Sequence, residues 1–201
     1  TNVEGIAYST KINDTQFKAG YLLKNAATTT ETSNENSVAY VQGVQTFKLG
    51  KDKLVTEVSG YSEDKGNSTS AKAKDLKTLT VGGEYTLVLD SPIEMAQVKG
   101  QYITSDADDN NTGYTAGVVV GSKAINKKGA WQVALDYKKL EKNAFPYMNA
   151  DTLLDQKITK ATATTYIAPS TNLEVAYEMH DYIVNTAKNN NVIYAALNYT
   201  F

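Results

Sequence analysis

The only histidine of the chain, His180, lies close in sequence to two carboxylates, Glu174 and Glu178. A histidine and an acid are common components of acid–base and nucleophilic catalysis. On a β-strand, however, the two glutamates are separated by roughly 13 Å, more than glycosidases use. No nucleophile motif stands beside His180. We therefore predict a solvated histidine and no enzyme, although barrels that act as lipases or proteases keep the enzymatic alternative open.

The acidic segment 106–111, DADDNN, is a second candidate site. It resembles the start of a calcium-binding EF-hand loop, whose carboxylates and amides coordinate the ion. Asn111 stands where that loop needs a glycine, and Gly117 stands where it needs a glutamate. The sequence therefore favours a solvated external loop, with adventitious cation binding as the alternative, and we predict neither a metal site nor a cofactor.

A third group of candidates consists of charged residues that recur on one face of alternating segments. If these segments line a channel, the inward charges determine which solutes pass. Lysines and carboxylates are mixed in this set, so we expect a weakly selective pore; charges that only solvate a plugged lumen are the alternative. The predicted pore-lining residues are Lys11, Lys18, Lys24, Glu57, Glu84, Lys123, Asp136, Lys138, Glu174, Glu178 and His180.

Strands are the elements that must position these residues. Apolar and polar residues alternate with a period of two from one end of the chain to the other, which is typical of strands with two different faces. In the last segment, for example, Ile193, Leu197 and Tyr199 share one face. The eleven predicted strands are 5–12, 16–24, 38–49, 54–61, 79–89, 93–103, 114–123, 131–140, 159–167, 173–184 and 192–201.

The links between these segments alternate between short and long without exception. Short turns such as 13–15 and 50–53 are followed by long links such as 25–37 and 63–75. Short periplasmic turns, long external loops and strands of about 9 to 11 residues are typical of a transmembrane β-barrel. We therefore predict an all-β fold, a transmembrane antiparallel β-barrel with about 11 strands in this chain, in a single domain over residues 1–201.

Aromatic residues gather toward the strand ends, as in the interfacial girdles of membrane barrels. A soluble β-rich binding protein also alternates and stays open as an alternative. The girdle residues predicted on the short-turn side are Phe17, Phe47, Trp131, Tyr199 and Phe201, and those on the long-loop side are Tyr21, Tyr61, Tyr102, Tyr114, Tyr137 and Tyr182.

Composition excludes several classes of protein. Cysteine is absent, which excludes disulfides and thiolate sites. All 20 basic residues are lysines interspersed with acids, and the net charge is −2, so we expect no nucleic-acid binding. Fourteen tyrosines and only three prolines fit a chain built of strands.

The loop 142–157 carries Phe145, Pro146 and Tyr147. We expect this loop to narrow the pore, to bind a neighbouring subunit or to pack on the rim of the barrel.

An odd strand number is a problem for a complete barrel, because bacterial single-chain barrels have an even number. If the terminal Phe201 is periplasmic, the first strand begins on the external side. The expectation is therefore that strands and any periplasmic anchor precede Thr1 in a longer protein; a miscounted strand is the alternative.

The chain ends in Asn198-Tyr199-Thr200-Phe201, with aromatic residues at its last and third-last positions. This ending resembles the signal that barrel-assembly machinery reads, so Tyr199 and Phe201 are assigned to it. With its tyrosine-rich strands, lysine-only bases and Thr/Asn-rich loops, the chain resembles the C-terminal barrel of porins with an S-layer-homology domain, the OmpM-like family. The resemblance implies the C-terminal part of a barrel of about 16 strands, trimeric, with a cell-wall tether in the missing N-terminal domain.

The function expected from these observations is an outer-membrane porin, a water-filled channel for passive diffusion of small hydrophilic solutes. Its expected partners are outer-membrane lipid, two further copies in a homotrimer, and the barrel-assembly machinery during biogenesis. The expected location is the bacterial outer membrane. The alternative function is a structural barrel that anchors the outer membrane to the cell wall without an open pore.

Overall fold

The structure is a computed structural model, and it describes residues 2–25, 35–64, 75–125, 127–145, 155–183 and 189–199. All regular elements in these ranges are β-strands, and none of the described residues belongs to a helix long and apolar enough to cross a membrane. The prediction of an all-β fold is confirmed.

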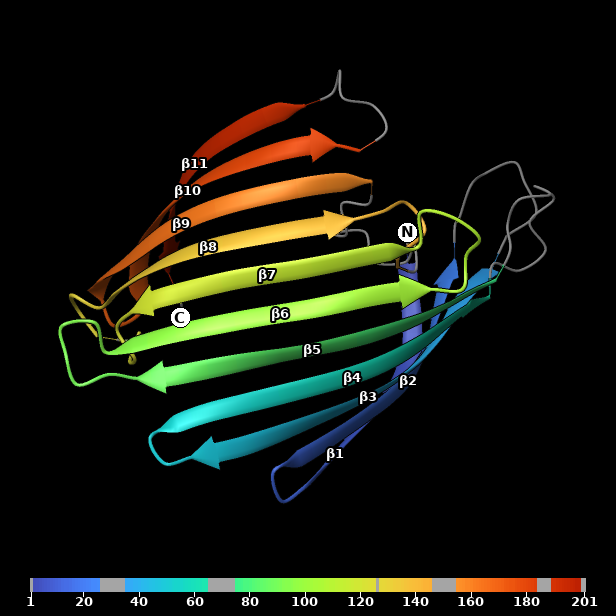
Figure 1. Ribbon diagram of the computed structural model, residues 1–201, viewed down its shortest axis with the longest axis horizontal. Helices are drawn as coiled ribbons and strands as arrows, with labels where there is room; N and C mark the ends of the chain where they lie inside the picture. Colours follow the sequence, from blue (N-terminus) through green and yellow to red (C-terminus); the bar gives the residue numbers. More distant parts are fainter. Residues whose placement is uncertain are drawn as a thin grey trace.

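Eleven antiparallel strands form one sheet, in which each strand pairs with the strand before it and the strand after it (Figure 1). This meander confirms the predicted number of strands. Their bounds are β1 Asn2–Ile12, β2 Thr15–Asn25, β3 Glu35–Leu49, β4 Asp52–Asp64, β5 Leu76–Val88, β6 Met95–Ser105, β7 Thr112–Gly121, β8 Trp131–Leu140, β9 Gln156–Ala168, β10 Thr171–Tyr182 and β11 Asn190–Tyr199.

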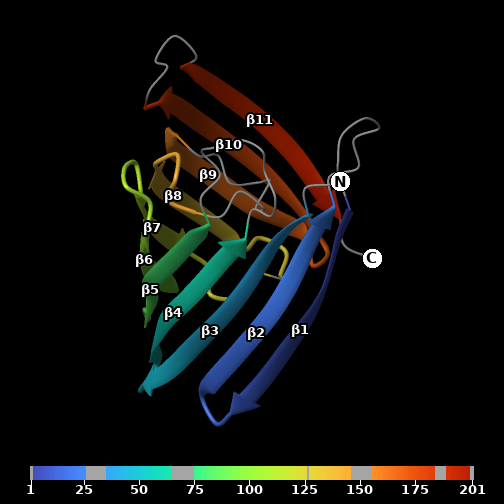
Figure 2. The same cartoon turned by 90° about the vertical axis from the view of Figure 1, so that its right-hand side faces the viewer.

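The sheet is strongly curved, and the view in Figure 2 shows the strands following one another around an arc from β1 to β11. It therefore has a concave face and a convex face. Among the described residues, β1 pairs only with β2 and β11 pairs only with β10. The arc is that of an open barrel wall with an edge at β1 and another at β11.

Adjacent residues of one strand show how different the two faces are. Val58 of β4 and its partner Val81 of β5 are 51% and 48% exposed on the convex face. One residue further along, Ser59 and its partner Thr80 are each 1% exposed on the concave face. The polar residues are therefore buried and the apolar residues are exposed, the reverse of a soluble sheet that covers a hydrophobic core.

The convex face is apolar along the middle of every strand. Ile6, Val41, Val98, Leu135 and Ile193 are each between 51% and 75% exposed there. In the part of the chain that the structure describes, the charged residues of this face lie only at strand ends. They are Asp52, Asp64, Lys77, Lys139, Lys157 and Asp181. A face that is apolar in its middle and charged at its margins is typical of the lipid-facing surface of a barrel wall.

Tight turns join the strands at one end of the sheet. The β1–β2 turn has Asn13 at a φ of 55°, and the β3–β4 turn has Gly50 at a φ of 67°, values that asparagine and glycine tolerate best. The predicted alternation of short and long links fails on both sides of the β6–β7 link 106–111, because the β5–β6 link 89–94 is equally long and the β7–β8 link 122–130 is longer. Gly121, at a φ of 143°, ends β7 early, and Ser122 then closes the link by donating its backbone N–H to Trp131.

Candidate functional site

A row of alternating charges crosses the concave face. The strand register places Glu84 of β5 opposite Lys99 of β6, and Asp136 of β8 opposite Lys160 of β9. Lys160 in turn lies opposite Glu178 of β10. Because residues opposite one another on antiparallel strands have side chains within about 5 Å, the row brings opposite signs together across the sheet. We call Glu84, Lys99, Asp136, Lys160 and Glu178 the charge row.

Direct ion pairs link the members of the charge row to their neighbours. Lys53 Nζ lies 3.6 Å from a carboxylate oxygen of Glu84. Lys99 Nζ lies 2.7 Å from Asp136 Oδ1, although β7 runs between β6 and β8. The β7 residue at this level is Gly117, whose missing side chain leaves the space that the pair occupies. Both signs are thus held in fixed positions on the wall.

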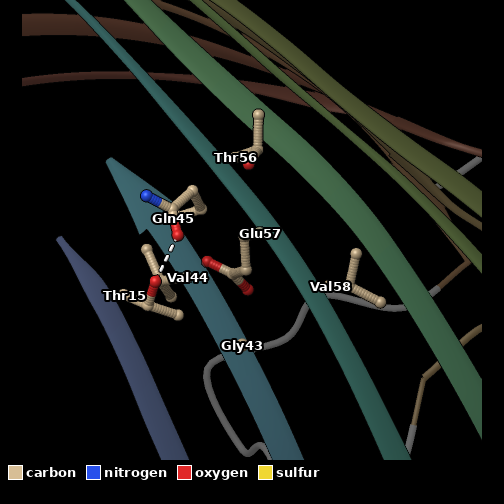
Figure 3. A pocket seen from close by; sticks show the side chains of 7 residues that line it. All are labelled: Thr15, Gly43, Val44, Gln45, Thr56, Glu57 and Val58. Carbon is tan, nitrogen blue, oxygen red and sulfur yellow. Dashed lines mark hydrogen bonds between the residues drawn. The ribbon is translucent and has the colours of Figure 1, made fainter. Parts of the chain in front are cut away.

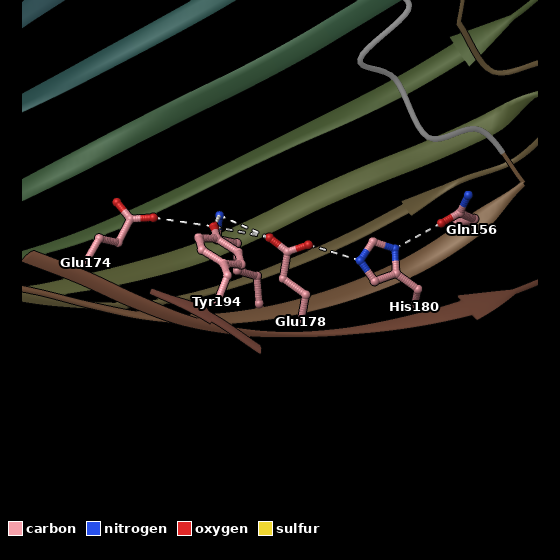
Figure 4. A network of polar contacts seen from close by, with 6 residues as sticks. Gln156, Glu174, Glu178, His180 and Tyr194 are labelled. Carbon is pink, nitrogen blue, oxygen red and sulfur yellow. Dashed lines mark hydrogen bonds and ion pairs between the residues drawn. The ribbon is translucent and has the colours of Figure 1, made fainter. Parts of the chain in front are cut away.

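The end of the row on β9 to β11 is a connected network, shown in Figure 4. Lys160 Nζ lies 3.1 Å from Glu178 Oε1 and also donates to the hydroxyl of Tyr194. The other oxygen of Glu178 lies 3.0 Å from His180 Nε2, and His180 Nδ1 lies 3.2 Å from Gln156 Oε1. Tyr194 also joins this network to Glu174, at 3.4 Å.

The network shows what His180 and its carboxylate neighbours do. Both ring nitrogens of His180 lie within hydrogen-bonding distance of a side-chain oxygen, and Glu178 is paired with a lysine. The hydroxyl of Tyr194 lies 3.4 Å from Glu174 and 3.5 Å from Glu178, so it stands between the two carboxylates. The arrangement fixes charges and hydrogen-bonding groups on the concave face.

Most of the predicted pore-lining residues do lie on the concave face. The strand register places there Lys11, Lys18, Glu57, Glu84, Asp136, Lys138, Glu174, Glu178 and His180. The side chain of Lys24 lies outside the described residues. Lys123 lies beyond β7, which ends at Gly121, and its backbone N–H donates to Glu94, so the strand alternation on which its predicted inward position rested does not extend to it.

Four lysines of the concave face were missed, namely Lys48, Lys53, Lys99 and Lys160, together with Tyr194. Their signal was present in the alternation, since Lys99 stands between Gln97 and Gln101 on the same face. The pairing of Lys99 with Asp136 had no comparable signal, because it depends on the order and register of three strands.

The start of the β8–β9 loop folds over the concave face. Phe145 packs against Tyr61 of β4, with ring centroids 4.9 Å apart and planes at 61°. To reach β4 from the end of β8, the loop must cross the level of β7, β6 and β5. Ala144 is fully buried and clusters with Ile103 and Leu140. Residues 141–145 thus cover part of the long-loop end of the wall.

Hydrogen bonds hold this segment to the β6–β7 hairpin. Glu141 accepts from the backbone N–H and the hydroxyl of Thr112, at 3.1 and 2.9 Å. It also accepts from Lys139 at 2.8 Å, and this bond above all holds the pKa of Glu141 below its ordinary value, against the opposite effect of burial. Asn143 accepts from the hydroxyl of Ser105 at 2.6 Å and donates its backbone N–H to Asn110. Residues 141–145 are therefore anchored to the β6–β7 hairpin at Glu141 and at Asn143.

A small depression lies between β2, β3 and β4, lined by Thr15, Gly43, Val44, Gln45, Thr56, Glu57 and Val58 (Figure 3). The hydroxyl of Thr15 donates to Gln45 within it. Gly43 leaves open space, since a Cβ there would meet no atom within 4 Å. Glu57 is the one ionisable residue of this lining, so the depression gathers no charged cluster comparable to the charge row.

The remaining candidates are the acidic segment 106–111 and the predicted assembly signal. In segment 106–111, Asp106 accepts from the backbone N–H of Lys77, and Asn111 donates to carbonyl oxygens of its own loop. Within the described residues, no group of three or more His, Asp or Glu side chains could hold a metal ion. Tyr199 of the predicted assembly signal lies at the end of β11 and is 60% exposed, and Phe201 lies outside the described residues.

Two of the aromatic residues predicted in the girdles are placed differently. Tyr61 lies opposite Tyr40 and packs against Phe145, on the concave face. Tyr182 lies opposite Gln156, also on the concave face. The prediction that these two face lipid is wrong because it counted position along the strand and ignored the alternation. Tyr21, Tyr102 and Tyr114 do lie exposed on the convex face.

No curated protein matches the chain. Residues 69–161, however, match the model of a protein family described as "Putative porin". The matched segment contains β5 to β8 and the first part of β9, and with them Glu84, Lys99, Asp136 and Lys160 of the charge row. The match therefore supports a porin family for this chain.

Proposed function

We propose that this chain forms the wall of a water-filled channel in the bacterial outer membrane, through which small hydrophilic solutes diffuse passively. The single observation that carries the proposal is the reversal of the two faces. Apolar side chains are exposed on the convex face, and charged and amide side chains line the concave face. In a barrel wall, the first face meets lipid and the second meets water.

The pairing within the charge row favours weak selectivity. Lys99 with Asp136, and Lys160 with Glu178, place opposite charges side by side, so neither sign dominates this part of the wall. A ring of one sign would select strongly by charge. The proposed channel discriminates mainly by size, and residues 141–145 reduce its width at the long-loop end.

Both edges of the sheet need partners in a bilayer, because each unpaired backbone group in hydrocarbon costs several kcal/mol. The proposed barrel is therefore closed by pairing of the β1 and β11 edges, with each other or with further strands. The proposed assembly is a homotrimer surrounded by outer-membrane lipid.

One observation favours the second candidate, a structural barrel without an open pore. The loop segment 141–145 already covers part of the concave face, and a longer cover would close it. The two functions differ in a single property, the passage of ions through the folded protein.

Single-channel conductance of the intact, detergent-purified protein in a planar bilayer tests the proposal. We expect stable conductance steps with a small reversal potential in a salt gradient, since both signs line the wall. β-sheet circular dichroism and heat-dependent mobility in gels show whether the protein is folded. Absence of conductance from folded protein would contradict the proposed channel and favour the structural barrel.

A further inference from the structure

A tyrosine ring lies flat on the concave wall near the long-loop end of β3. Tyr40 is paired with Gly20 of β2, and a Cβ on Gly20 would come within 2.8 Å of the ring's Cζ and hydroxyl oxygen. The ring thus occupies the space above the glycine. A ring that covers a glycine has one face against the sheet and the other face toward the concave side.

A second ring widens this surface. Tyr61 of β4 lies beside Tyr40, with centroids 6.2 Å apart and planes inclined by only 27°. Phe145 stands edge-on to Tyr61 and forms a raised margin from the β8–β9 loop. We call Tyr40 and Tyr61, with Phe145 at their margin, the aromatic platform. All three residues are only partly buried.

Hydrogen-bonding groups surround the platform, and two of them, Glu57 and Glu63 on the same face of β4 as Tyr61, are carboxylates. One step toward the short turns, Gln42 and Ser59 lie opposite each other on the same two strands. Thr78 of β5 lies opposite Tyr61, and Thr80 lies opposite Ser59. The hydroxyl oxygens of Thr78 and Thr80 are buried and have no hydrogen-bond partner in the described part of the chain. Ser59, Thr78 and Thr80 are at most 4% exposed, whereas Gln42 is only partly buried, so Gln42 is the group of this set that a solute on the concave side can reach.

We infer that the aromatic platform is a binding subsite for neutral saccharides on their way through the channel. The C–H face of a pyranose ring stacks on a flat aromatic ring, while its hydroxyls exchange hydrogen bonds with amides and hydroxyls at the margin. Gln42, which is only partly buried, is placed to make such bonds at the margin of the rings. This inference rests on the proposed function, since it requires the concave face to be the channel lumen.

The test is the interruption of single-channel current by added sugar. Maltohexaose is the probe, and an uncharged poly(ethylene glycol) of similar mass controls for size. We expect maltohexaose to interrupt the current with a concentration-dependent frequency, whereas the glycol lowers the conductance without discrete interruptions.

Variants at Tyr40 distinguish stacking of the sugar on the aromatic ring from the effect of side-chain size. Tyr40→Leu removes the ring face and is expected to weaken maltohexaose binding about tenfold, while Tyr40→Phe keeps the ring and binds about as well as the parent. Tyr166→Leu, a concave-face tyrosine on β9, is the matched control and is expected to leave binding unchanged.

The outcomes distinguish the two proposals. Open channels that maltohexaose does not interrupt, or that both probes block alike, overturn the subsite and leave the channel intact. Equal binding by Tyr40→Leu and the parent also overturns the subsite. Absence of any conductance from folded protein overturns the proposed function and, with it, the subsite.

Discussion

Lys99 and Asp136 form an ion pair across a whole strand, with Lys99 Nζ 2.7 Å from Asp136 Oδ1 and Gly117 of β7 between them. The pair exists because the intervening position carries no side chain. Both charged groups keep substantial exposure, at 43% and 33%, so solvent screens the pair and its contribution to stability is modest. Its main consequence is positional, since it fixes one positive and one negative charge on the wall.

Gly117→Ala is expected to separate Lys99 from Asp136. An added Cβ would collide with Asp136 Oδ1 and come within 2.5 Å of Lys99 Cε. We expect the free energy of unfolding to fall by about 1 kcal/mol, measured by urea unfolding in lipid vesicles. Gly43→Ala is the control, because a Cβ there meets nothing within 4 Å. Equal effects of the two substitutions would contradict the role of Gly117.

Neutralising one member of the pair Lys160–Glu178 is expected to change ion selectivity. Glu178→Gln leaves the lysine charge uncompensated and should favour anions, whereas Lys160→Gln should favour cations, each by roughly twofold in the permeability ratio. The variant that carries both substitutions should have a permeability ratio close to that of the parent protein. Reversal potentials in a salt gradient measure these ratios. Lys51→Gln, which breaks an exposed pair with Asp90 in the short turns, should have no effect, and an equal shift there would argue against the charge row.

Phe145→Ala is expected to loosen the loop segment from the wall. The substitution removes the ring contact with Tyr61, and because Phe145 is only partly buried the cost in unfolding free energy should be about 1–2 kcal/mol. Single-channel conductance should rise, since the loop segment no longer narrows the lumen. Lys142→Ala, at an exposed neighbouring position, is the control. Unchanged conductance in Phe145→Ala would show that this segment does not limit ion flow.

The anchor at Glu141 predicts a pH dependence of stability. Its pKa is below the ordinary value of 4.5, chiefly because Lys139 donates a hydrogen bond to it. A lowered folded-state pKa means that the stabilisation is complete above pH 4.5 and is lost as the pH falls through the folded-state value. At neutral pH, Glu141→Gln should lower the unfolding free energy by about 1–2 kcal/mol. The difference between parent and variant should shrink below pH 4.5, and a difference that stays constant down to pH 3 would contradict the anchor.

Neighbouring residues of β8 test which face meets lipid. Leu135→Arg places a charge in the middle of the convex face and should destabilise the folded protein in a bilayer by about 2–4 kcal/mol. Ala134→Arg places the same charge on the concave face and should cost far less, because water solvates it there. Unfolding in lipid vesicles by urea measures both values. A larger cost for Ala134→Arg would reverse the assignment of the faces.

The alternation of residue types determined most of the fold. In β11, Ile193, Leu197 and Tyr199 share a face because side chains alternate strictly along a strand, so the sequence alone predicted the strand and its apolar face. The same rule predicted the inward position of Glu84, Asp136 and Glu178. It does not apply to Lys123, because a glycine with positive φ ends β7 two residues earlier.

Local periodicity is a property of each strand by itself, whereas the site depends on distances between strands. Lys99 meets Asp136, and Phe145 meets Tyr61, only because the meander order, the register and the curvature bring positions far apart in the sequence to one wall. A shift of register by two residues would keep the alternation and still break the Lys99–Asp136 pair. The sequence therefore determined the strands, their two faces and the mixed charges of the concave face. The tertiary structure decided which charges pair, which ring covers Gly20 and where the loop crosses, because these depend on contacts across the sheet that no single strand encodes.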